Sequence, residues 1–336
     1  MISKKNTMIV TDFYYKSRNM VSMKKIIIFT LLVFLSLPLF SGKISWDSCQ
    51  LKGKVKKWVF EFYNLEGGRK KTVSEITLFN PDGTAKERVK LIQNQFHIKE
   101  TYHYINGDLV IWKKYKQPDE VHSYKKLIYH NKRLKEIHHY LKDKLTYFIV
   151  YNYNNEGRTR SIIKRNSQGM ITEKKIIHLD ENRNIISEVF LNNKNQEIRK
   201  FINTYQHNNL VSRIRYFRGK KQIKMINRYK NGNKVLELTY DKNDVLIKMI
   251  SHHYQNNRLI RDELWQREKY HSNTIYTYNS AEQLVKRTTV NSKGKLLIRI
   301  NMEYDLTGNM IKKETICPGC RNMSSHFMQL YRYEYY

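Results

Sequence analysis

The sequence predicts an all-β protein, a long curled antiparallel meander of about 17 to 20 short strands. Tyrosine is abundant, with 25 residues against only 4 prolines, and it favours the pleated, half-buried surface of a sheet. A short turn motif recurs along the chain, and between its copies apolar and polar residues alternate with a period of two. A sheet this long must hide its apolar face, so we expect β-hairpin repeats in an open spiral or a shell-like curl.

The turn motif has an aromatic or large apolar residue, then Asn or Asp, one or two small or polar residues, and an aliphatic residue. Residues 104–109, Tyr-Ile-Asn-Gly-Asp-Leu, are one copy. Asn, Asp and Gly tolerate the positive φ that tight hairpin turns require. We expect one tyrosine per copy to be a structural anchor of the repeat. The anchors are Tyr104, Tyr129, Tyr153, Tyr205, Tyr229, Tyr240, Tyr254, Tyr278 and Tyr304.

Alternation around the anchors predicts one mostly apolar face and one mostly charged face. Counting back by two from Tyr304 gives Met302 and Ile300, whereas the positions between them are Glu303 and Asn301. The same count gives Leu238 and Leu236 before Tyr240, and Tyr151 and Ile149 before Tyr153. We therefore expect the tyrosines to lie on the concave face of the curl.

The N-terminal region predicts an exported protein. Met23-Lys24-Lys25 precedes an apolar run over residues 26–40, and Ser41 and Gly42 follow. A run of 15 residues is shorter than the roughly 20 that a spanning helix needs, and basic, apolar and small residues in this order are typical of a secretory signal. The alternative is a retained anchor. The expected organisation is an upstream extension (1–22), a signal peptide (23–42), a β-hairpin repeat domain (43–310) and C-terminal capping strands (311–336).

The charge of the chain is strongly positive. Lys and Arg number 62 against 30 Asp and Glu, a formal net charge of +32. Removing residues 1–42 leaves 56 against 29, or +27 for the mature chain. Such a charge favours polyanions, including acidic glycans, lipopolysaccharide and anionic lipid. Because the charges are spread evenly along the sequence, a compositional bias with no partner remains the alternative.

Several copies of the turn motif resemble the YD repeats of bacterial Rhs-type proteins. Residues 304–311, Tyr-Asp-Leu-Thr-Gly-Asn-Met-Ile, are most similar to that pattern, and residues 151–158 are also similar. The resemblance covers about residues 60–310 and implies a β-rich shell or spiral strip of hairpins in secreted and surface proteins, some of which encapsulate toxins. MORN-like repeats are a second, weaker resemblance. Many copies lack the glycine and replace Asp with Asn, and the proline-containing segment that closes Rhs shells has no counterpart, so a toxin cage is not expected.

No sequence motif predicts catalysis or a cofactor. Phosphate-binding loops, His-Glu-x-x-His and Gly-x-Ser-x-Gly do not occur. Neighbours in a strand point to opposite faces, so the adjacent pairs His138-His139 and His252-His253 are not expected to share a metal ion. Cys317-Pro318-Gly319-Cys320, with His326 nearby, is a weak metal-site candidate. Its alternatives are a redox-active pair and a turn that carries a disulfide or free thiols.

These observations predict a non-catalytic exported repeat protein of the cell envelope, the cell surface or the secreted fraction, without a transmembrane anchor in the mature chain. It would present a basic β surface that binds a protein or an acidic glycan or lipid. Nucleic acid is not an expected partner of an exported chain. The alternative is a shell-like or inhibitor-type structural protein of a toxin system, and an exposed sheet edge would also allow a dimer.

Overall fold

The protein is described here from a computed structural model, which describes residues 45, 49, 51–66, 68, 70–153, 159–320 and 325–336. The expected upstream extension and signal peptide therefore lie outside the described residues. The chain divides into two compact units, one of residues 1–42 and 320–323 and the other of residues 43–319 and 324–336. The architecture below is that of the second unit. Within the described residues, no helix is long and apolar enough to cross a membrane.

The described chain forms 22 β-strands. They are β1 (Val55–Asn64), β2 (Lys70–Phe79), β3 (Ala85–Ile92), β4 (Gln95–Ile105), β5 (Asp108–Tyr115), β6 (Val121–His130), β7 (Arg133–Leu141), β8 (Lys144–Tyr153), β9 (Thr159–Asn166), β10 (Ile171–Leu179), β11 (Ile185–Leu191), β12 (Glu197–Gln206), β13 (Asn209–Phe217), β14 (Lys220–Lys230), β15 (Asn233–Tyr240), β16 (Leu246–Gln255), β17 (Arg258–Gln266), β18 (Lys269–Tyr278), β19 (Leu284–Asn291), β20 (Leu296–Tyr304), β21 (Met310–Ile316) and β22 (His326–Tyr335).

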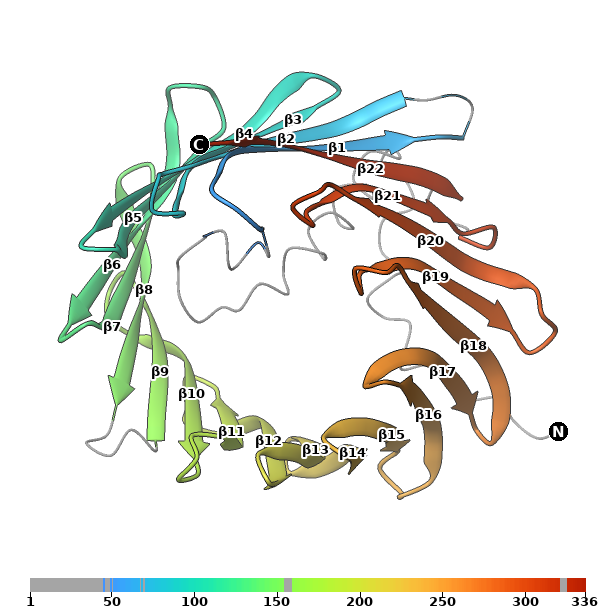
Figure 1. Cartoon of the computed structure of the whole chain (residues 1–336). Helices are drawn as coiled ribbons and strands as arrows, with labels where there is room; N and C mark the ends of the chain where they lie inside the picture. Colours follow the sequence, from blue (N-terminus) through green and yellow to red (C-terminus); the bar gives the residue numbers. More distant parts are fainter. Residues whose placement is uncertain are drawn as a thin grey trace, which may run out of the picture. The chain divides into compact units, whose positions relative to one another are not determined.

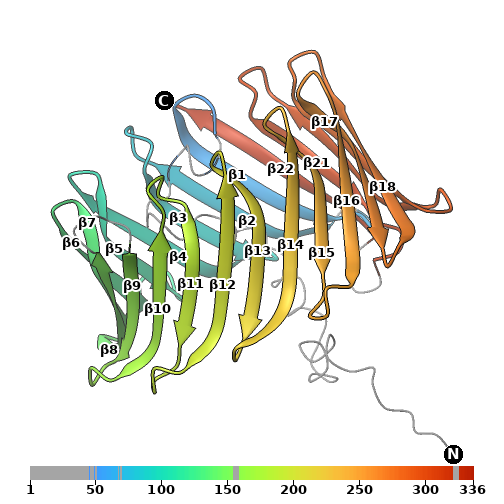
Figure 2. The same ribbon diagram turned by 90° about the horizontal axis from the view of Figure 1, so that it is seen from below.

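The strands close into a barrel. Each strand pairs antiparallel with the next, and β22 also pairs antiparallel with β1, so the ring has no open edge (Figure 1). The all-β antiparallel meander is confirmed, whereas the expected open spiral is wrong. Closure satisfies the backbone groups that an open sheet leaves unpaired at its two edges. Figure 2 shows the strands running side by side with hairpins at both rims.

Aromatic packing reinforces the seam between the first and last strands. The ring of Phe60, only 3% exposed, lies 5.4 Å from that of Tyr331. Phe62 and Phe327 approach to 5.2 Å across the same seam. Burial of such rings, beyond their pairing geometry, is among the larger contributions to a sheet's stability. The most deeply buried apolar side chains of the barrel therefore include those where its two ends meet.

Two kinds of hairpin connect the strands. In the tighter kind both central residues have positive φ, as at Asn231 (51°) and Gly232 (77°), the conformation of a type I′ turn. In the wider kind an Asn or Asp precedes the turn, and its carboxylate or amide oxygen accepts backbone N–H groups. Asp241 Oδ1, for example, accepts from Asn243 (2.8 Å) and Val245 (3.0 Å). Acceptance of backbone N–H groups by the side-chain oxygen, in addition to tolerance of positive φ, explains why Asn and Asp recur in the repeat motif.

The register of the strands assigns each side chain to the inner or the outer face. Cross-strand partners share a face, and neighbours in a strand point to opposite faces. Leu127 is 7% exposed, whereas the next residue, Ile128, is 43% exposed. Side chains converge on the concave side of a closed sheet, so the face of Leu127 is the inner face.

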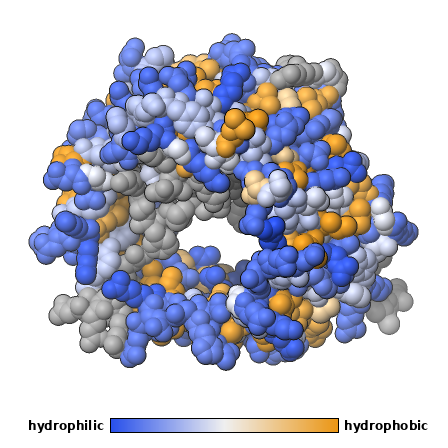
Figure 3. All heavy atoms as spheres, viewed as in Figure 1, coloured by the Kyte–Doolittle hydropathy of each residue, from blue (hydrophilic) through white to orange (hydrophobic). Residues whose placement is uncertain are grey.

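Both faces mix charged and apolar side chains, so the expected division into an apolar and a charged face is wrong. Arg88 and Lys90 lie on the inner face, and Leu238 lies on the outer face. A ring of 22 strands encloses more space than its inward side chains fill, so it has no single packed core that would require one uniformly apolar face. Figure 3 shows hydrophilic and hydrophobic residues interspersed around the ring.

Six of the anchor tyrosines at the ends of even-numbered strands link successive hairpins along one rim. The hydroxyl of Tyr229 donates a hydrogen bond to the carbonyl oxygen of Leu210 (3.1 Å), and Leu210 is the register partner of the preceding anchor, Tyr205. The same relation recurs around the ring. It joins Tyr129 to Leu109, Tyr153 to Leu134, Tyr254 to Lys234, Tyr278 to Leu259, Tyr304 to Leu284 and Tyr333 to Met310.

Tyr240 differs from the other anchors in position. It ends the odd-numbered strand β15, so it lies at the opposite rim from Tyr229, which ends the antiparallel neighbour β14. Its register partner is Lys224, which places Tyr240 on the outer face together with Leu238. The expectation that all anchors lie on the concave face is therefore wrong for Tyr240. The sequence period spans one strand, whereas the structural period spans a hairpin of two.

Candidate functional site

Four inner carboxylates of the barrel form ion pairs with inner cations. Arg88 donates from Nε to Glu75 Oε1 (2.8 Å) and lies 3.7 Å from Glu100, and both carboxylates are at most 14% exposed. Two further inner carboxylates act in the same way. Glu188 pairs with Lys175 and Arg213, and Glu237 pairs with Lys234 and Lys248. Although burial alone would raise it, Lys234 and Lys248 hold the pKa of Glu237 below its ordinary value.

Strands β5 to β9 lack such carboxylates on their inner face. In the described residues of these strands, the only inner-face acid is Asp108, at the rim where β5 begins. Lys114, Lys125 and Lys164 lie on this face, and none of the three forms an ion pair among the residues the structure describes. Inner-face acids flank this stretch, because Glu100 on β4 and Glu173 on β10 are the register partners of Lys114 and Lys164. The stretch itself carries more positive than negative charge.

Aromatic rings hold two of these lysines. Lys125 Nζ lies 4.3 Å from the ring centroid of Trp112, and Lys164 Nζ lies 4.7 Å from that of Tyr147. His139 stacks on the other side of this cluster, with its ring 4.7 Å from Tyr147 and an interplanar angle of 8°. Cation–π contacts of this kind stabilise a cation without neutralising it. We call this group the cationic wall: Trp112, Lys114, Lys125, His139, Tyr147 and Lys164.

The electrostatics of the cationic wall disfavour additional positive charge. Burial, opposed by Glu100 and reinforced by Lys114, lowers the pKa of Lys125. Burial, together with the charges of Lys125 and Lys164, lowers the pKa of His139. A bound anion would reverse both effects, because an opposite charge favours the protonated form of each group.

A pocket of about 400 Å³ lies at the rim on three strands that also contribute to the wall. His130, Asn131, Arg133, Lys135 and Tyr153 line it. The guanidinium of Arg133 lies 5.9 Å from the ring centroid of Tyr153. Arg133 and Lys135 are exposed, so the pocket extends the positive character of β6 to β8 toward the opening of the barrel.

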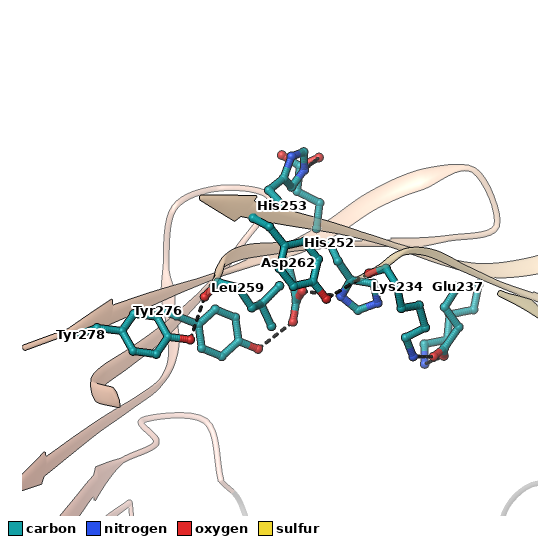
Figure 4. A network of polar contacts seen from close by, with 11 residues as sticks. Lys234, Glu237, His252, His253, Leu259, Asp262, Tyr276 and Tyr278 are labelled. Carbon is teal, nitrogen blue, oxygen red and sulfur yellow. Dashed lines mark hydrogen bonds and ion pairs between the residues drawn. The ribbon is translucent and has the colours of Figure 1, made fainter. Parts of the chain in front are cut away.

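A second polar cluster lies on the inner face of β16 to β18. Asp262 receives a hydrogen bond from the hydroxyl of Tyr276 (2.6 Å), and its other oxygen lies 2.6 Å from His252 Nδ1 (Figure 4). Burial and the carboxylate raise the pKa of Tyr276. His253 points to the opposite side of the sheet, as strand geometry requires (Figure 4). The cluster fixes the imidazole of His252 in one orientation and satisfies the half-buried charge of Asp262.

The structure does not gather the weak metal candidates into a site. Cys317 and Cys320 are disulfide-bonded, so their sulfur atoms are not thiolate ligands in this state. His326 Nε2 lies 2.6 Å from Glu314 Oε1. Among the described residues, no cluster of three or more His, Cys, Asp or Glu is arranged to hold a metal ion.

None of the residues of the cationic wall was singled out from the sequence as a binding residue. Lys114 and Lys125 each belong to a Lys-Lys pair, Lys113-Lys114 and Lys125-Lys126, so sequence alone does not distinguish the inner lysine from the outer one. The histidine pair His138-His139 contained a usable signal, since one of any two strand neighbours must face inward. Deciding which of the two histidines faces inward requires the register of the strands β5 to β9.

Comparisons with known proteins find only solved structures of low sequence identity. No family model matches the sequence, and no curated protein matches it. The crystal structure of TcdB2-TccC3-Cdc42 is similar with 13% identity over 79% of this chain and 16% of that chain, at a TM-score of 0.30. This chain thus spans about one sixth of the chain it matches there.

Two porin-like structures are also similar. A porin-like protein from Bacteroides uniformis has 9% identity over 84% of this chain and 98% of that chain, at a TM-score of 0.32. The low-pH structure of OprB from Pseudomonas putida has 10% identity over 82% of this chain and 91% of that chain, at a TM-score of 0.24. Likenesses this distant carry no argument about function.

Proposed function

We propose that this protein is a non-catalytic β-barrel of the cell envelope or cell surface that binds an anionic partner. The observation that carries the proposal is the cationic wall, where three inner lysines form no ion pair among the described residues, whereas cations elsewhere on the same face do. Lysine ammonium groups that contact aromatic rings and form no ion pair are suited to binding an anionic ligand. The signal-like segment at residues 23–42 supports the envelope or surface location.

The charged side chains of the outer face favour a barrel whose outer surface is exposed to water. Membrane-spanning barrels carry an outward apolar band at mid-strand. Here the outer face places ion pairs there, such as Lys99 with Glu87 (3.4 Å) and Arg261 with Glu263 (3.2 Å). Charged outer side chains are also consistent with the net charge of +32.

A closed ring also favours a second candidate, a shell-like structural protein of a toxin system. The distinguishing feature is its occupant, since a shell of this kind would enclose polypeptide. Its test is co-expression with any toxin encoded beside it. Retention of that toxin inside the purified barrel would support this candidate over the first.

The first proposal is tested by binding of the purified full chain to immobilised heparin and lipopolysaccharide across a salt series. Binding that weakens steeply as salt rises is expected, because screening weakens attraction between exposed charges. Absence of binding to both surfaces at low salt would overturn the proposal and leave the charge as a compositional bias.

A further inference from the structure

A row of side chains crosses five neighbouring strands of the inner face. Tyr102 pairs with Trp112, Trp112 with Lys125, Lys125 with His139, and His139 with Tyr147. At the usual interstrand spacing this row is about 19 Å long. Lys164 adds a cation on the next strand, where its ammonium contacts the ring of Tyr147.

We propose that the cationic wall is the ligand site of the barrel and that its ligand is an acidic oligosaccharide, bearing sulfate or carboxylate groups, lying across β5 to β9. This proposal rests on the proposed function and assigns its site and ligand class. Lys125 in the row, with Lys114 and Lys164 beside it, places cations on the three strands β5, β6 and β9, so the site fits a chain of repeated anionic units better than a single small anion.

The rings of the wall hold the lysines and leave little open aromatic surface. One face of Trp112 packs against Tyr102, with centroids 6.4 Å apart, and Lys125 lies over the ring as well. Tyr147 contacts both His139 and Lys164 in the same way. Binding of single-stranded nucleic acid relies on stacking of bases on free aromatic faces. A wall that offers ammonium groups instead favours an acidic glycan.

The rings also restrict the lysines before any ligand arrives. A free lysine side chain loses considerable rotamer entropy when it is immobilised on binding. Contact with Trp112 and Tyr147 places Lys125 and Lys164 in position beforehand, so less entropy is lost when the ligand binds. None of Lys114, Lys125 and Lys164 forms an ion pair among the described residues, so the ligand has no such pair to displace at these three lysines.

The location on the inner face restricts the shape of the partner. The row lies inside a closed ring, so a ligand must enter through an opening of the barrel. An extended oligosaccharide can do so, whereas the surface of a folded protein cannot follow a concave inner wall. The rim pocket with Arg133 and Lys135 lies on β6 to β8 and provides positive charge at one entrance.

The sequence supplies a matched control for the test. Lys114 and Lys125 face inward, and their chain neighbours Lys113 and Lys126 face outward on the same two strands. The inner variant Lys114→Gln/Lys125→Gln and the outer variant Lys113→Gln/Lys126→Gln therefore remove the same charge from the same strands. Binding of a short heparin oligosaccharide to the full chain is measured for wild type and both variants, with thermal unfolding as the check of folding.

The inner variant is expected to bind at least roughly tenfold more weakly, because it removes two charge-assisted contacts with the ligand, and the outer variant less than about threefold. Equal weakening by both variants, or none by either while the wild type binds, would overturn the site and leave the proposed function standing. If the wild type binds no polyanion, the proposed function fails as well. Tighter binding of single-stranded oligothymidylate through the same two lysines would overturn the ligand class.

Discussion

The hydroxyl of Tyr229 donates a hydrogen bond to the carbonyl oxygen of Leu210 and so links the β14–β15 hairpin to the β12–β13 hairpin before it. Leu210 is the register partner of the preceding anchor, and a register shift occurs immediately before Tyr229. A β-bulge leaves a backbone group unpaired in its ladder and bends the strand. The tyrosine thus supplies a donor at a rim where the regular ladder is interrupted.

Tyr254→Phe tests the contribution of these contacts. The substitution removes the hydrogen bond to Lys234 O (3.0 Å) and keeps the ring, so a loss of about 1 kcal/mol in the free energy of unfolding is expected. Chemical denaturation measures the loss. Tyr240→Phe is the control, since Tyr240 has no hydroxyl hydrogen bond among the described residues and should change stability by less than about 0.5 kcal/mol. Equal losses in both variants would contradict the role of the hydrogen bond.

Alkaline pH is expected to weaken the fold. Burial raises the pKa of Tyr129, Tyr254 and Tyr304 above the ordinary value of tyrosine. A group that holds its proton more tightly in the folded state contributes stability that is fully present below about pH 10 and is lost as pH rises through the folded-state pKa. Denaturation between about pH 8 and pH 11 should show this decline. A constant free energy of unfolding over that range would contradict it.

Glu188→Gln tests the contribution of the inner-face ion pairs to stability. The carboxylate is 13% exposed and pairs with Lys175 and Arg213 (3.2 Å), so its neutralisation leaves two half-buried cations without a counter-charge. We expect a loss of about 1–3 kcal/mol in the free energy of unfolding. Glu303→Gln is the matched control on the outer face, because that carboxylate is 55% exposed and its pair with Lys312 should contribute less than about 1 kcal/mol. A larger effect from Glu303→Gln would contradict this ranking.

A cross-link tests closure of the barrel. Val59 on β1 is the register partner of Arg332 on β22, and cross-strand partners approach closely enough for a disulfide. Oxidation of the Val59→Cys/Arg332→Cys variant should give an intramolecular link, detected by mass spectrometry of peptides. Val59→Cys/Lys126→Cys should not link within one chain, since Lys126 lies on β6. Links formed only between chains would indicate an open sheet that dimerises by its edges.

The hairpin architecture could be predicted from the sequence because its signals are local. Asn231-Gly232 and Asp241 mark turns by chemistry that acts within a few residues. The number of strands was underestimated, 22 against about 17 to 20, because several turns lack the motif. Arg267-Glu268 and Lys142-Asp143 form two-residue turns with positive φ at both positions, without glycine or asparagine.

Closure and the cationic wall could not be predicted because both depend on long-range register. Phe60 meets Tyr331 only after 21 hairpin connections have set the twist and stagger of the sheet. Likewise, Lys125 and Lys126 have the same local chemistry, and only the register with Trp112 assigns the first of them to the inner face. Local alternation gives two faces for each strand, and it does not relate the faces of one strand to those of the next.

Lysine footprinting of the full chain tests the central claim most directly. An amine-acetylating reagent is applied with and without a saturating short heparin oligosaccharide, and fragmentation mass spectrometry resolves Lys125 from its neighbour Lys126. The account predicts that the oligosaccharide protects Lys125, Lys114 and Lys164, which face the interior, and leaves Lys126 as reactive as before. Protection of Lys126 with no protection of Lys125 would contradict it, because the ligand would then lie on the outside of the barrel.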